Sequence, residues 1–215
     1  FKRLLDLVVC LPVSVLLMPL FLIIALLIKV YDGGPVLYKQ PRLTVNGKVF
    51  NIYKFRSMCM DSEKGGAQLA KKNDDRITPV GRVLRALHFD EFPQLINIIK
   101  GDMSIVGPRP QLVRDMIFMT DEQRKRHFVR QGLTGLAQVN GRNNISWEEK
   151  LNYDLEYIQN ITFIGDLKII LKTVLKVFRK DDINTDGMDT AEDLCDYLLR
   201  TKQITEEEYK EKLKI

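Results

Sequence analysis

The sequence has few cysteines, and the three that it has lie far apart. Cys10, Cys59 and Cys195 match no spacing that is typical of a metal site. Nor do they form the closely spaced, even-numbered set of a disulfide-stapled secreted domain. We therefore expect three reduced thiols, as in a protein that faces the cytosol.

The apolar run near the N-terminus also lacks the features of a cleavable signal peptide. Residues 4–28 are apolar apart from Asp6, Ser14 and two prolines, which is too long for a signal peptide, and no small-residue cleavage site follows. As a helix this run reaches about 37 Å, more than the roughly 30 Å of a hydrocarbon core. The sequence therefore predicts membrane insertion. The chain begins at Phe1 rather than Met, and we expect a few native residues to precede it.

Two forms of this membrane segment are open: a straight span, or a re-entrant helix that enters one leaflet and returns. Pro19 lies deep in the run, where it removes a backbone hydrogen bond and bends a helix. Basic residues flank both ends, so the positive-inside rule does not select one side. Asp6 must lie near the interface or find a partner, because a lone carboxylate in lipid is costly. These observations favour the re-entrant form.

The net charge of +5 suits an anionic membrane surface, a phosphorylated substrate or nucleic acid. Nucleic acid is the weakest of the three, because the basic residues cluster with carboxylates and glycines rather than with stacking aromatic side chains. We therefore expect no nucleic-acid partner.

Two adjacent carboxylates, Asp90 and Glu91, stand directly before a predicted short helix from Pro93 to Lys100 that Gly101 ends. Free N–H groups at a helix start favour anions and phosphates. Taken alone, the pair is typical of surface helix caps. Neighbouring helical residues point about 100° apart, so the two carboxylates cannot share a proton and need different tasks.

Cations surround this pair in the sequence. A predicted hairpin turning at Asn46-Gly47 leads into Lys54 and Arg56, which would share one side of a strand and could contact one phosphate. A helix over residues 80–87 would present Arg82 and Arg85 on one face. Arg109 stands between two prolines, so its backbone is restrained before any ligand binds.

Residues 131–143 contain three glycines and read as a loop followed by a strand. In that strand Gln138, Asn140 and Arg142 would alternate onto one face, which suits a nucleotide or sugar diphosphate. The spacing is not that of the dinucleotide-binding fingerprint.

The C-terminal third contains helical patterns. Ser146 to Glu149 is a capping box, and residues 165–179 form a basic amphipathic helix typical of a membrane interface, with core packing as the alternative. Residues 182–187 match half of an EF-hand loop, but the twelfth position is Asp193, so calcium binding is disfavoured. Residues 191–215 predict two short helices, which suggests an oligomerisation element.

Together these motifs resemble the bacterial sugar transferases, the monotopic phosphoglycosyl transferases that start lipid-linked glycan assembly. The resemblance covers about residues 1–184. Met18 stands where the family often has serine, and the C-terminal extension lies outside the common core. The matching segments are Met18-Pro19, Tyr53 to Met58, Arg85, Asp90-Glu91 with Pro93-Gln94-Leu95, Lys100 to Ser104, Gly107-Pro108-Arg109-Pro110, Gly135 to Asn143 and Trp147.

The resemblance implies a mostly helical α+β fold: a membrane anchor over residues 1–30, a cytosolic catalytic domain over 31–184 that carries a short β-hairpin and interfacial helices, and a C-terminal helical hairpin over 185–215. It also implies an enzyme of a bacterial inner membrane, acting on its cytoplasmic face. Asp90 would be the nucleophile that takes a sugar phosphate from a UDP-sugar, releasing UMP, before polyprenyl phosphate accepts it.

In the same resemblance Glu91 assists as base or metal partner, and Asp90 helps to hold Mg²⁺. The other expected substrate contacts are Lys54, Arg56, Arg85, Arg109, Gln138, Asn140 and Arg142. The competing interpretation is a non-catalytic membrane scaffold that binds anionic lipid or a partner protein. The sequence does not identify the sugar.

Overall fold

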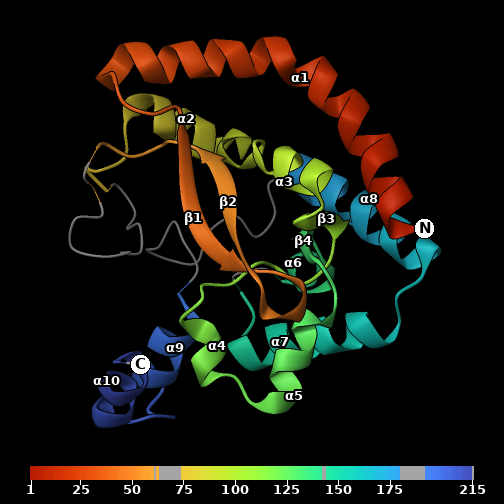
Figure 1. Cartoon of the computed structure of the whole chain (residues 1–215), viewed down its shortest axis with the longest axis vertical. Coiled ribbons are helices and arrows are strands. Elements are labelled where there is room, and N and C mark those ends of the chain that lie inside the picture. The colour runs from red at the N-terminus through yellow and green to blue at the C-terminus, as the bar shows by residue number, and fades with distance from the viewer. Residues whose placement is uncertain (61, 63–73, 142–143, 180–191, 215) are drawn as a thin grey trace.

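The computed structural model describes residues 1–60, 62, 74–141, 144–179 and 192–214. The half-EF-hand pattern at residues 182–187 lies outside this described part. A long helix arches over a small mixed domain, and a short C-terminal pair of helices lies at the opposite end (Figure 1). The elements in chain order are α1 (Lys2–Asp32), β1 (Leu37–Leu43), η1 (Val45–Gly47), β2 (Val49–Phe55), α2 (Pro79–Ala86), η2 (Phe89–Glu91), α3 (Gln94–Lys100), β3 (Met103–Val106), α4 (Asp115–Phe118), α5 (Asp121–Arg124), η3 (Lys125–Phe128), β4 (Gln131–Thr134), α6 (Leu136–Val139), α7 (Trp147–Gln159), α8 (Phe163–Arg179), α9 (Leu194–Arg200) and α10 (Glu206–Leu213).

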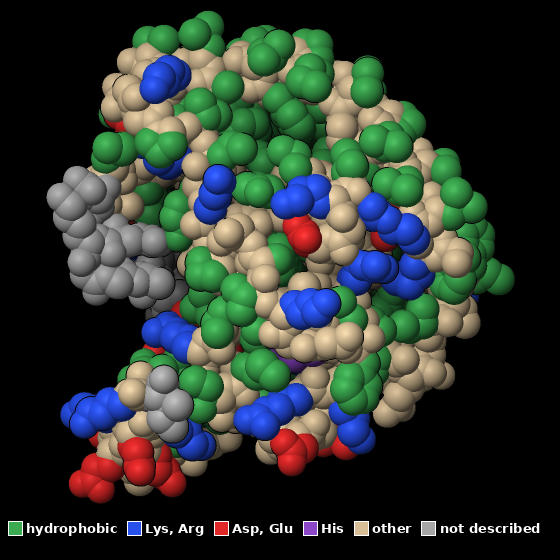
Figure 2. Space-filling view, viewed as in Figure 1, with side chains coloured by type: hydrophobic (Ala, Val, Ile, Leu, Met, Phe, Trp, Pro, Cys, Tyr) green, Lys and Arg blue, Asp and Glu red, His purple; other side chains and the backbone are tan. Residues whose placement is uncertain are grey.

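Helix α1 is long and apolar enough to cross a membrane, as predicted. It bends in its middle (Figure 1) and contains Pro12 and Pro19, each of which removes a helical hydrogen bond. Much of its outer face is apolar and exposed, and Figure 2 shows many hydrophobic side chains along this edge of the molecule, with backbone between them. Exposed apolar area of this extent marks a surface that meets lipid or another apolar partner.

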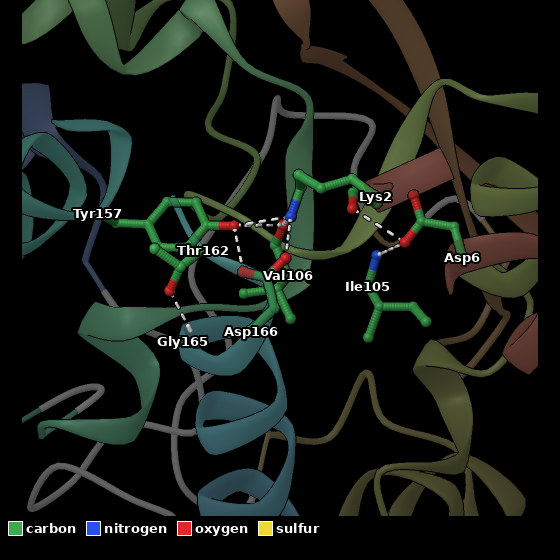
Figure 3. A network of polar contacts seen from close by, with 9 residues as sticks. Lys2, Asp6, Ile105, Val106, Tyr157, Thr162, Gly165 and Asp166 are labelled. Atoms are coloured by element: carbon green, nitrogen blue, oxygen red, sulfur yellow. Dashed lines mark hydrogen bonds and ion pairs between the residues drawn. The ribbon is translucent and has the colours of Figure 1, made fainter. Parts of the chain in front are cut away.

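The first turns of α1 are fastened to the domain by polar contacts (Figure 3). Asp6 is buried, and its Oδ1 accepts hydrogen bonds from Ser104 Oγ and Ile105 N at 3.0 and 2.9 Å. The predicted need of Asp6 for a partner is thereby confirmed. Arg3 donates to the carbonyl groups of Ile98 and Ile99 in the last turn of α3, where carbonyl groups lack partners within the α-helix. The first turn of α1 therefore holds the C-terminal end of α3, the helix that follows Asp90-Glu91.

The predicted hairpin is present as the antiparallel pair β1–β2. Its turn uses Asn46 and Gly47 at φ of 57° and 68°, the left-handed backbone that Asn-Gly adopts readily. The ladder of paired residues extends from the Leu43–Val49 pair to the Leu37–Phe55 pair. Phe55 then packs edge-to-face on Phe21 of α1 at 5.6 Å between ring centroids.

The predicted strand alternation of Gln138 and Asn140 is wrong. Strand β4 ends at Thr134, and Gln138 lies in the short helix α6, with Asn140 as its C-cap. The strand cannot continue because its parallel partner β3 ends at Val106, and Pro108 beyond it has no N–H for the ladder. Arg142 lies outside the described residues.

Helix α7 begins at the predicted capping box, in which Ser146 and Glu149 bond each other's backbone N–H groups. Helix α8 follows, and it leaves Ile164, Leu171 and Leu175 exposed. This exposure favours the interfacial interpretation over core packing.

Helices α9 and α10, called here the C-terminal hairpin, confirm the predicted helical pair, and a capping box at Thr205 and Glu208 starts α10. Leu194 and Cys195 pack into a small cluster with Phe118, Trp147 and Leu151. The predicted role of this hairpin in oligomerisation stays a prediction, since these side chains pack against the hairpin's own domain.

Candidate active site

The Asp90-Glu91 pair lies in a tight turn between two helices. Helix α2 ends at Ala86, and His88 then adopts φ of 56°, a left-handed conformation that is uncommon for residues other than glycine, although histidine adopts it more often than most. The chain continues through the single 3₁₀ turn η2 into α3. The sequence predicted the pair immediately before a helix, and this is confirmed. Both residues of the pair are half-buried in this turn.

Helix α2 is brought close to the end of β2 by a glycine. A Cβ atom on Gly81 would overlap the carbonyl oxygen of Ser57, so only glycine allows this approach. The contact lets Arg85 Nε donate to Ser57 Oγ at 2.9 Å. Arg82, predicted on the same face, is exposed on α2. Arg85 is thus held near Asp90, on the helix that follows the strand that supplies Lys54.

Glu91 is the centre of an ion cluster. Its Oε1 accepts from Lys54 Nζ at 2.8 Å and from Arg109 Nη2 at 2.9 Å. The three side chains come from η2, β2 and the Pro-Arg-Pro segment, so the fold joins residues up to 55 positions apart in the sequence. One carboxylate facing two cations leaves a positive excess, which favours a phosphorylated ligand.

Asp90 differs from its neighbour. Within the described part of the chain, no other side chain donates a hydrogen bond to its carboxylate. Partial burial raises the pKa of Asp90 and the adjacent charge of Glu91 raises it further, while Lys54 and Arg85 act in the opposite direction. The pair is therefore divided: Glu91 is engaged by cations, and Asp90 is available.

A family comparison agrees with this geometry. Residues 1–180 match the family described as bacterial sugar transferase. The chain belongs to this family.

Curated relatives of the bacterial sugar transferase family match most of the chain. The uncharacterized sugar transferase EpsL of Bacillus subtilis is 41% identical over 191 residues, which is 89% of this chain and 94% of the relative. A UDP-glucose:undecaprenyl-phosphate glucose-1-phosphate transferase of Caulobacter vibrioides is 40% identical over 190 residues, or 84% and 71% of the two chains.

A longer relative is the UDP-N-acetylgalactosamine-undecaprenyl-phosphate N-acetylgalactosaminephosphotransferase of Aeromonas hydrophila. It is 41% identical over 180 residues, which is 80% of this chain and 42% of that enzyme. The predictions of the family and of a sugar-phosphate transferase are confirmed.

The remaining predicted substrate contacts of this bacterial sugar transferase are spread out. Arg56 forms an ion pair with Asp32 at the end of α1, whereas Lys54 pairs with Glu91, so the two cations face different carboxylates. Gln138 has a buried side-chain amide with no hydrogen-bond partner among the described residues. An unpaired buried amide is costly, which makes Gln138 a candidate for a ligand contact.

Asp90 fits the kind of magnesium site that one or two carboxylates make with the phosphates of a substrate. Within the residues described, no three acidic, histidine or cysteine side chains gather into an all-protein metal cage. The available carboxylate of Asp90 and the raised pKa of its carboxyl both favour a nearby cation. Mg²⁺ held in part by Asp90 stays a prediction.

One feature of this site escaped prediction. Behind Arg109 lies an ion pair between Arg126 and Asp154, which are 1% and 3% exposed. Arg126 is in the short 3₁₀ helix η3, and Asp154 is on α7, 28 positions later. No local pattern joins the two residues, so only the tertiary structure could reveal their contact.

Proposed function

We propose that this protein transfers a sugar 1-phosphate from a UDP-sugar to undecaprenyl or a similar polyprenyl phosphate and releases UMP. Relatives at about 40% identity carry names with this reaction. The product would be a polyprenyl-diphosphate sugar, the first membrane intermediate of an exopolysaccharide, capsule, O-antigen or glycoprotein glycan.

The single observation that supports this function best is that Glu91 forms ion pairs with two cations, whereas no other described side chain donates a hydrogen bond to the neighbouring Asp90 carboxylate. In the first step an Asp90 carboxylate oxygen would attack the β-phosphorus of the UDP-sugar. The bond from that phosphorus to the bridging oxygen breaks, and UMP leaves with this oxygen. In the second step a polyprenyl phosphate oxygen attacks the same phosphorus, and the Asp90 carboxylate is released.

Glu91 would act as the residue that places the cations. Through Oε1 it holds Lys54 and Arg109 together, and both would then face the diphosphate charge that grows during attack. Mg²⁺, when bound with the diphosphate, would offset further negative charge. Burial of the Asp90 carboxylate favours attack, because the anion has less hydrating water to lose.

A lipid acceptor gives a reason for the apolar anchor. The predicted re-entrant form, with Pro19 at its bend, would keep both ends of α1 on the cytoplasmic face of the bacterial inner membrane. The exposed apolar residues of α1 and α8 would then contact the bilayer. The phosphate of polyprenyl phosphate lies at the same membrane surface as the site.

The test is UMP release by purified protein in detergent or nanodiscs with Mg²⁺, undecaprenyl phosphate and a panel of UDP-sugars. We expect release with at least one UDP-sugar, and its loss in Asp90→Asn, which keeps the size of the side chain. If no UDP-sugar gives UMP, while vesicle binding weakens steeply with salt, the protein is the anionic-lipid scaffold instead.

A further inference from the structure

The buried ion pair between Arg126 and Asp154 is the starting point. Arg126 Nε and Nη2 donate to Asp154 Oδ2 at 2.9 and 2.6 Å. A buried pair of this kind adds little stability over apolar side chains of the same size, since both charges lose their hydration. Arg126 Nη1 is also buried without a partner among the described residues. Stability alone therefore does not explain the pair.

Arg126 makes one further contact that points to the site. Its Nη2 donates to the backbone carbonyl oxygen of Arg109 at 2.9 Å. The side chain of the same Arg109 donates to Glu91. The buried guanidinium thus connects, through one residue, to the carboxylate that lies beside Asp90. A lysine at position 126 would offer one flexible ammonium in place of Nε and Nη2, so it would not keep the fixed geometry toward Asp154 and Arg109.

The segment from Val106 to Arg109, called here the strap, is held by one backbone group of each of its four residues. The Val106 carbonyl accepts from Lys2 Nζ at 2.9 Å, and it lies 3.2 Å from the Tyr157 hydroxyl, whose single proton is shared with Asp166 Oδ1 at 2.8 Å; Figure 3 shows these groups converging. Gly107 N donates to the Thr134 carbonyl, and the Pro108 carbonyl accepts from Gly132 N. Arg126 holds the last carbonyl of the strap.

Helix α7 supplies a hold at both ends of this strap. Tyr157 reaches Val106, and Asp154, three residues earlier on the same face of α7, orients Arg126 on Arg109. The flanking prolines already restrict the backbone of Arg109. Together these contacts fix the backbone of Arg109, and the guanidinium at the end of its side chain bonds Glu91.

We propose that Arg126 and Asp154 are positioning residues that place the Arg109 guanidinium for the substrate diphosphate. This inference rests on the proposed function, in which Arg109 contacts phosphate. It extends the site by a layer behind the strap, which acts on substrate only through Arg109. A displacement of about 1 Å in such a group is enough to lower a rate about 100-fold.

The test is a double-mutant cycle on UMP release with four proteins: wild type, Arg126→Lys, Arg109→Ala and the double variant. We expect Arg126→Lys to lower kcat/KM about 10-fold or more, mainly by raising KM for the UDP-sugar. In the Arg109→Ala background the same change should cost less than about twofold, because its target is gone. Arg114→Lys, at an arginine that pairs with Asp193 and Asp196, is the matched control and should leave kcat/KM unchanged.

An equal loss in both backgrounds would mean that Arg126 has a general structural role, and would overturn the inference. So would full activity of Arg126→Lys. A wild-type protein that releases no UMP would overturn the proposed function itself, which is a separate result. If Arg126→Lys loses its thermal transition, Asp154→Glu takes its place in the cycle, since it keeps both charges and shifts Arg126 by one methylene.

Discussion

At Glu91 one carboxylate oxygen is shared by two cations, whereas at Arg114 one guanidinium nitrogen is shared by two carboxylates. Lys54 and Arg109 meet Glu91 at 2.8 and 2.9 Å. Asp193 and Asp196 meet Arg114 Nη2 at 2.7 and 3.1 Å. Both clusters join distant parts of the chain, yet their net charges have opposite signs.

The sign of the net charge distinguishes a cluster suited to binding substrate from a cluster that holds two parts of the fold together. The Glu91 cluster has surplus positive charge and lies beside Asp90, whose carboxylate has no partner of its own among the other described side chains. The Arg114 cluster has surplus negative charge and ties the C-terminal hairpin to the domain, next to buried Asp115. Only the first lies wholly within residues 1–180, the part that matches the family. A polyanionic substrate is drawn to the first cluster and repelled by the second.

The largest expected effect is at Glu91. Glu91→Gln removes the charge that holds Lys54 and Arg109, so we expect kcat/KM for UMP release to fall about 100-fold. The matched change in the other cluster is Asp193→Asn, which should leave kcat/KM within about twofold of wild type. Steady-state assays of both variants make the comparison, and equal losses would remove the distinction between the clusters.

A smaller effect is expected at Arg109. Arg109→Lys keeps the charge but loses the two-pronged geometry for phosphate, so KM for the UDP-sugar should rise about 10-fold with a lesser change in kcat. Initial rates over a range of UDP-sugar concentrations measure both constants. A fall in kcat with unchanged KM would place Arg109 in the chemical step instead of in ground-state binding.

Beside the Arg114 cluster, at Asp115, we expect an effect on the stability of the fold. Burial, and then the charge of Asp193, raise the pKa of Asp115 to about 6. In the unfolded chain its pKa is about 3.9, so between these values the folded protein keeps a proton that the unfolded chain releases. Folding is therefore opposed by this group increasingly as the pH rises from about 4 to about 6.

Asp115→Asn removes that penalty. We expect the variant to gain about 1–2 kcal/mol of unfolding free energy over wild type at pH 7 and to gain nothing at pH 4. Urea unfolding at both pH values is the measurement. A gain that is the same at both would show that the ionisation of Asp115 is not the cause.

The smallest effect is a shift in a pH profile. Because attack needs ionised Asp90, UMP release should decline as the pH falls through the raised pKa of this carboxyl. Lys54 lowers that pKa, so Lys54→Met should move the acid limb of kcat/KM to higher pH. The control is Lys210→Met on α10, which should leave the limb in place. If the acid limb of kcat/KM stays in place in Lys54→Met, the charge of Lys54 does not affect the ionisation of Asp90.

Much of the fold was accessible from sequence because its signals are local. The Asn46-Gly47 turn, the capping box at Ser146 and the glycine after Lys100 each fix one element end. The site pair Asp90-Glu91 was found from its position before a helix together with family motifs.

The rest depends on contacts between distant residues. Lys54 and Arg56 are two positions apart, yet one turns to Glu91 and the other to Asp32, because α1 brings a carboxylate to the second. The strand predicted over Gln138 and Asn140 failed because its partner β3 is only four residues long. The Arg126–Asp154 pair gave no local signal at all.

The most direct test of the account is the intact mass of the protein incubated with UDP-sugar and Mg²⁺ in the absence of polyprenyl phosphate. The account predicts a mass increase of one sugar phosphate, located on the peptide that contains Asp90, with UMP released in equal amount. The adduct should vanish on addition of polyprenyl phosphate and should not form in Asp90→Asn. UMP released only when the lipid acceptor is present, with no adduct at any time, would contradict a covalent role for Asp90.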